Sequence, residues 1–72
     1  MQITIQYEVM KLLHNTSLEV PENIPLSDLT LRIQAHVGVS SIFLFYQGAQ
    51  ITDQNYREFL QSKSICIVRI AA

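Results

Sequence analysis

The sequence predicts an α+β domain in which a mixed β-sheet of four to five strands packs on one helix. Residues 1–7 and 16–20 alternate apolar and polar side chains with period two, as half-buried strands do. An apolar stripe at helical spacing runs over residues 26–37. The runs 42–46 and 65–70 are rich in the aromatic and β-branched residues that are typical of strands.

The first two strands are expected to form an antiparallel hairpin, because consecutive strands with a short connection usually pair in this way. Their connection lies within residues 8–13, although this segment lacks the Asn-Gly or Gly-Gly pair of a tight hairpin turn. Pro21 ends the second strand, since proline has no N–H to donate to a neighbouring strand.

The helix is expected to begin near Pro25 and to end at Gly38. Ser27 is a candidate N-terminal cap, and Asp28 suits the first turn because the helix dipole favours a negative charge there. Glycine readily adopts the left-handed conformation that often closes a helix. The apolar stripe between these ends consists of Leu26, Leu29, Ile33 and Val37.

The C-terminal half adds the remaining strands. A turn over residues 47–50 follows the strand at 42–46, and Ile51 begins a very short strand. A short helical turn over 56–60 then precedes the last strand, 65–70. One helix covers only one face of such a sheet, so the other face stays open to water or to a partner.

Composition excludes several classes of function. The chain has 72 residues, of which 49% are apolar and 15% charged, with a net charge of −1. This composition suits one small domain, residues 1–72, and we expect it to be a module of a longer protein. The chain lacks the basic stripe of a nucleic-acid binder and the basic cluster of a membrane-surface contact. No apolar run approaches the roughly 18 residues of a membrane-spanning helix.

The residues that could carry chemistry are few and scattered. A single cysteine, Cys66, excludes an internal disulfide and a multi-cysteine zinc cage. His14 and His36 are expected to be surface histidines, and the carboxylates are dispersed. We therefore expect no enzymatic activity, no cofactor or metal site and no small-molecule substrate. Because no basic lead-in precedes the first strand, we expect no signal peptide and an intracellular location, cytoplasmic or nuclear.

Short motifs in collinear order over essentially the whole chain resemble the ubiquitin-like family. They are Met1-Gln2-Ile3, Leu18-Glu19-Val20, Ile33-Gln34 followed by Gly38, and the segment from Gly48 to Asp53. The resemblance implies a ubiquitin-like β-grasp fold. Each motif is weak by itself, and their order along the chain is what carries the resemblance.

The end of the chain departs from the family pattern. Where ubiquitin has a terminal Gly-Gly that is activated and joined to lysines, this chain has Ala71-Ala72. The resemblance therefore implies a domain that is not conjugated. Two alternatives remain open: a conjugatable modifier processed from a precursor with Gly-Gly beyond Ala72, and a sulfur carrier or small enzyme on the same fold.

The resemblance also implies a protein-binding surface on the open face of the sheet. The matching positions are Phe45, Cys66 and Val68, and strand alternation adds Phe43 and Ile70 to the same face. Such an exposed apolar patch predicts a protein partner, an adjacent domain of the same chain or a second copy. The opposite register also remains open, because residues 42–46 are all apolar. It would place Phe43 and Phe45 in the core and expose Leu44.

Overall fold

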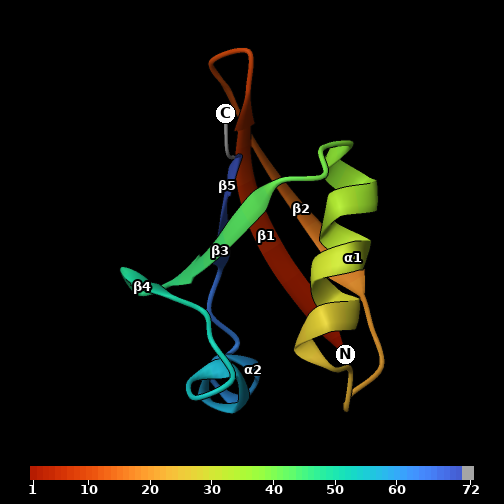
Figure 1. Ribbon diagram of the computed structural model, residues 1–72, viewed down its shortest axis with the longest axis vertical. Helices are drawn as coiled ribbons and strands as arrows, with labels where there is room; N and C mark the ends of the chain where they lie inside the picture. The colour runs from red at the N-terminus through yellow and green to blue at the C-terminus, as the bar shows by residue number, and fades with distance from the viewer. Residues whose placement is uncertain (71–72) are drawn as a thin grey trace.

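The computed structural model describes residues 1–70, and these form one mixed five-stranded sheet with two helices (Figure 1). The strand order is β2-β1-β5-β3-β4. This is an α+β fold with the ubiquitin-like β-grasp topology, as the sequence predicts. The elements are β1 (Gln2–Val9), β2 (Leu12–Glu19), α1 (Leu26–Val37), β3 (Ile42–Tyr46), β4 (Ala49–Gln50), α2 (Tyr56–Ser62) and β5 (Cys66–Ile70).

The C-terminal strand β5 lies between β1 and β3 at the centre of the sheet (Figure 1). It runs parallel to β1, with Ile5 beside Cys66, and antiparallel to β3, with Leu44 beside Val68. All other pairings are antiparallel. The first and last strands, β1 and β5, are therefore neighbours inside the sheet, and β2 and β4 form its edges.

The first hairpin is longer than the sequence indicates. Its second strand begins at Leu12 rather than at residue 16, and the turn consists of Met10 and Lys11 alone. Both turn residues have positive φ, 52° for Met10 and 65° for Lys11. Two-residue hairpin turns of this kind usually contain Asn or Gly. The tip of this hairpin projects beyond the rest of the molecule at the top of Figure 1.

The core lies between α1 and the inner face of the sheet. Leu29 and Ile33 of α1 are fully buried there, as the apolar stripe predicts, and Phe59 of α2 closes one end of the core. The ring of Phe59 meets that of Tyr46 edge to face at 5.6 Å between centroids. The buried apolar residues are Ile3, Ile5, Val20, Ile24, Leu29, Ile33, Leu44, Tyr46, Ile51, Phe59, Cys66 and Val68.

The two ends of α1 differ in how well they were predicted. The helix is preceded by Pro25, which makes no side-chain cap, so the expectation that Ser27 caps it is wrong. The carbonyl of Pro25 instead accepts a hydrogen bond from the Leu29 N–H at 3.0 Å. Gly38 ends the helix in the left-handed conformation (φ 82°), as expected.

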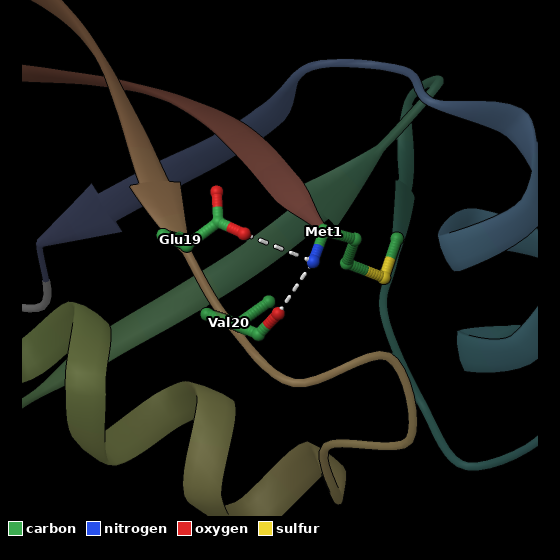
Figure 2. A network of polar contacts seen from close by, with 3 residues as sticks. All are labelled: Met1, Glu19 and Val20. Carbon is green, nitrogen blue, oxygen red and sulfur yellow. Dashed lines mark hydrogen bonds and ion pairs between the residues drawn. The ribbon is translucent and has the colours of Figure 1, made fainter.

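Hydrogen bonds close the open end of the hairpin, opposite its turn (Figure 2). The amino group of Met1 donates to the carbonyl of Val20 at 2.7 Å and lies 3.2 Å from Oε1 of Glu19. The N–H of Val20 donates back to the carbonyl of Met1 at 2.8 Å. Met1 and Val20 therefore form a hydrogen-bonded pair, which sets the alternation of hydrogen bonds along the whole hairpin.

Candidate functional site

The open face of the sheet has a polar half and an apolar half. On β1 and β2, the outward residues are polar except for Leu13, as in the cross-strand pair of Gln6 and Asn15. On β3 and β5, the outward residues include Phe43, Phe45 and Ile67. Apolar side chains therefore gather over one side of this face only, next to the centre of the sheet.

In β3 the structure confirms the expected register. Phe43 is 48% exposed and Phe45 is half-buried, whereas Leu44 and Tyr46 are each only 6% exposed and belong to the core. The alternative in which Leu44 faces outward is therefore wrong. This alternation places two phenylalanine rings on the outer face, at positions where strands of most proteins carry polar side chains.

In β5 the expected register is wrong. Cys66 is completely buried and Val68 is 4% exposed, so both are core residues rather than part of the open face. Val68 lies opposite the buried Leu44, and residues that face each other across a sheet share a side. By the same alternation Ile70 lies on the core side, where it is partly exposed (36%) because the strand ends there.

Ile67 and Arg69 take the outward positions that were expected for Cys66 and Val68. Ile67 lies opposite Phe45, and Arg69 lies opposite Phe43. The guanidinium carbon of Arg69 is 5.3 Å from the centroid of the Phe45 ring, within the range of a cation–π contact. At a surface such a contact stabilises by about 0.5–1 kcal/mol, so it holds the arginine across the aromatic ring.

We call the four outward residues the Phe43/Phe45 patch: Phe43, Phe45, Ile67 and Arg69. An open groove lies beside it, lined among others by Gln6, Glu8 and Leu13. Within residues 1–70 the guanidinium of Arg69 makes no ion pair. The patch therefore combines apolar contact area with a cation that is free to bind a carboxylate.

The sequence contains a signal for the correct register of β5. Residues 65–68 are all apolar, so they do not indicate which side chains face the core. Arg69, however, is charged and has no acidic neighbour in its strand. A lone charged residue in a strand belongs on the solvent side, because burying an unpaired charge costs several kcal/mol. Placing Arg69 outward places Ile67 outward as well and turns Cys66 and Val68 toward the core.

The side chain of Cys66 has little chemical reactivity. Burial raises the pKa of its thiol to about 12, although a hydrogen bond with the backbone of Phe45 acts in the opposite direction. The thiol is therefore protonated at neutral pH, and the reactive thiolate is essentially absent. Cys66 serves here as a small apolar residue of the core.

The two histidines lie on the helix side of the sheet, away from the Phe43/Phe45 patch. The ring of Tyr7 stacks on that of His14 at 5.2 Å and meets that of His36 edge to face at 6.0 Å. Both histidines are exposed, as expected. Within residues 1–70, no three His, Cys, Asp or Glu side chains lie together as a metal site requires.

One further polar side chain is held in a specific position for a structural reason. The hydroxyl of Tyr56 donates a hydrogen bond of 2.6 Å to the carbonyl of Ile24, which ties α2 to the segment before α1. Burial and the nearby charge of Asp28 raise the pKa of this phenol. No helix among residues 1–70 is long and apolar enough to cross a membrane.

Comparison of the sequence with protein-family models finds no match, and comparison with curated proteins finds no significant match. The fold and the surfaces of residues 1–70 are thus the basis for any statement about function. The expected effect of the Ala71-Ala72 ending falls on residues outside the described range.

Proposed function

We propose that this chain is a non-conjugated ubiquitin-like module that binds a protein partner, or a neighbouring domain of a longer protein, through the Phe43/Phe45 patch. One observation carries the proposal. Phe43, which is 48% exposed, lies with Phe45 and Ile67 on a sheet face that neither helix covers. Large apolar side chains that gather on an exposed face are typical of surfaces that bind another protein.

The chemistry of the patch favours a partner with an apolar anchor next to a carboxylate. Aromatic and arginine side chains are enriched at the centres of protein interfaces. An apolar side chain of the partner can pack on Phe43 and Ile67, while a carboxylate pairs with Arg69. Because the contact with Phe45 already orients the arginine, little conformational entropy is lost when the partner binds.

A binding role also fits the properties of the side chains that could have served catalysis. The thiol of Cys66 is buried and protonated, and the two histidines lie on the helix side of the sheet, away from the Phe43/Phe45 patch.

Affinity capture with matched variants tests the proposal. The chain is immobilised and exposed to cell extract in three forms: unmodified, Phe43→Ser with Arg69→Glu, and Leu31→Ser. Leu31 is 61% exposed on α1, so its substitution removes a comparable apolar side chain from another surface. Quantitative mass spectrometry should find at least one protein that the unmodified chain and the Leu31 variant retain and the patch variant loses.

Capture that is equal for all three forms would contradict the proposal. Loss of binding in the Leu31 variant alone would assign binding to the helix side of the domain instead. The non-conjugated character is tested separately by the mass of the endogenous protein. A free species near 8 kDa with a ladder of heavier adducts would show conjugation and refute that part.

A further inference from the structure

The outer edge of β2 is an unprotected sheet edge. β2 is eight residues long and, within residues 1–70, pairs only with β1. Proteins usually protect such an edge with proline, an inward-pointing lysine, a bulge or a very short strand. β2 has none of these features, and its ladder to β1 is continuous from Leu12 to Glu19. The other edge, β4, has only two residues.

The alternation of the hairpin identifies the free backbone groups. Met1 and Val20 form a hydrogen-bonded pair, and in an antiparallel ladder every second pair is of this kind. Leu12 and Leu18 therefore turn their N–H and C=O toward β1. The residues that turn theirs toward the free edge alternate with them, namely Leu13, Asn15, Ser17 and Glu19.

The side chains of β2 are complementary to a second copy of the same strand. Two strands related by a two-fold axis perpendicular to the sheet run antiparallel, and opposite residues lie on the same face. An axis through Asn15 sets apolar Leu12, which is 65% exposed, opposite Leu18. The remaining opposite pairs are Leu13 with Ser17 and His14 with Thr16, and Lys11, in the turn before the strand, comes near Glu19.

Charge favours the register with the two-fold axis at Asn15 over the register with the axis at Thr16. With the axis through Asn15, the hairpin turn of each copy brings Lys11, which makes no ion pair within residues 1–70, next to Glu19 of the other copy, whose carboxylate also lies 3.2 Å from its own Met1 amino group. An axis through Thr16 would instead set Leu13 opposite Glu19 and His14 opposite Leu18. In that register apolar side chains lie opposite polar ones, and no carboxylate of the second copy lies near Lys11.

We propose that the edge of β2 is the interface of a symmetric dimer, in which a second copy of this chain pairs its own β2 antiparallel with the two-fold axis at Asn15. The two sheets become one continuous sheet. Because the axis is perpendicular to the sheet, both Phe43/Phe45 patches lie on the same face of the continuous sheet. A dimer could therefore engage two sites on one partner, which raises the overall affinity without any new contact.

Sedimentation equilibrium over a range from about 10 μM to about 1 mM tests the dimer, since a single pair of edge strands forms a small interface of modest affinity. The unmodified chain should dimerise with rising concentration. Asn15→Pro removes the N–H at the axis and should weaken the association at least tenfold, while Asn15→Ala keeps this N–H and serves as the matched control. Proline is tolerated at an edge where the N–H faces solvent.

A charge exchange tests the register even if the proline variant fails to fold. Lys11→Glu should weaken the dimer, because it brings two carboxylates close together at each end of the interface. The double variant Lys11→Glu with Glu19→Lys should restore the association, and Glu19→Lys alone is its control because it also removes the ion pair with the Met1 amino group. Amide hydrogen exchange gives a separate signal: the N–H groups of Leu13, Asn15 and Ser17 should become protected as concentration rises.

A chain that stays monomeric up to about 1 mM would overturn the proposal. So would a dimer that is insensitive to Asn15→Pro and Lys11→Glu, and dissociation by Phe43→Ser would then locate the contact at the open face. If the three amides become protected only when an extended peptide is added, the edge binds a peptide strand and not a second copy.

Discussion

The turn of the first hairpin should be a source of strain that two substitutions remove. Met10 and Lys11 both have left-handed φ values, 52° and 65°, without being glycine or asparagine. Outside glycine this conformation costs about 1–2 kcal/mol per residue, because Cβ approaches the following carbonyl oxygen. The double variant Met10→Asn with Lys11→Gly supplies the residues that such a turn favours.

Two opposing effects set the expected magnitude. Glycine at position 11 removes most of the strain there, and asparagine at position 10 reduces it. Against this, glycine gives the unfolded chain more freedom, which lowers stability by about 0.4–1 kcal/mol. The side chain of Met10 is 91% exposed, so its loss removes little packing. We expect the free energy of unfolding to rise by about 1–2 kcal/mol. For a domain of this size, each kcal/mol raises Tm by roughly 4–8 °C.

Urea denaturation at low micromolar concentration measures this change without contribution from self-association. The variant Met10→Ala with Lys11→Ala is the control, because it removes the same side chains and keeps the strain. It should match the unmodified chain to within about 0.5 kcal/mol. A double variant with Asn and Gly that is no more stable than the alanine control would refute the strained turn.

Three further outcomes are expected. Val68→Asp should unfold the domain, because it buries an unpaired carboxylate at a cost of several kcal/mol. Phe43→Ser removes an exposed side chain and should lower the free energy of unfolding by no more than about 1 kcal/mol. Urea denaturation of the two variants compares these effects. The folded chain keeps the proton of Cys66, whose pKa is raised to about 12, while the unfolded chain loses it near the ordinary value of 9.0. The free energy of unfolding should therefore fall as pH rises above about 9, and Cys66→Ala should reduce this decline. Tyr56→Phe should lower the free energy of unfolding by about 1 kcal/mol in thermal denaturation, because it removes the hydrogen bond to Ile24.

Each of these outcomes has a clear opposite. A folded Val68→Asp variant combined with an unfolded Phe43→Ser variant would mean that the outer and inner faces are exchanged. Identical pH profiles for the unmodified chain and Cys66→Ala would mean that the thiol titrates as freely in the folded as in the unfolded state. An unchanged Tm in Tyr56→Phe would mean that the hydroxyl adds nothing to the attachment of α2.

The parts of the fold that were predicted correctly have an unambiguous pattern in the sequence. The alternation of residues 1–7 and the stripe with Leu29 and Ile33 each allow one orientation toward a core. Gly38 ends the helix as expected because the left-handed conformation there suits glycine. The resemblance to the ubiquitin-like family added the order of the elements, which the observed β-grasp topology matches.

The error in β5 occurs where the sequence does not indicate which side chains of a strand face the core. A continuous apolar run is compatible with either register. In β5, only the charge of Arg69 indicates which side faces solvent. The length of the hairpin was missed because Met10 and Lys11 are not residues that indicate a tight turn. The structure thus turns Phe43 and Phe45 outward as expected, and the outward residues beside them are Ile67 and Arg69 rather than Cys66 and Val68.

The central position of β5 has a consequence for the order in which the molecule can be built. Until residues 66–70 leave the ribosome, the β1–β2 hairpin and the β3–β4 pair have no strand between them. A lone two-stranded hairpin is marginally stable at best, and contacts between distant parts of a chain form slowly. We therefore expect folding to wait for the end of the domain. The Phe43/Phe45 patch is completed in the same step, because Ile67 and Arg69 arrive with that strand.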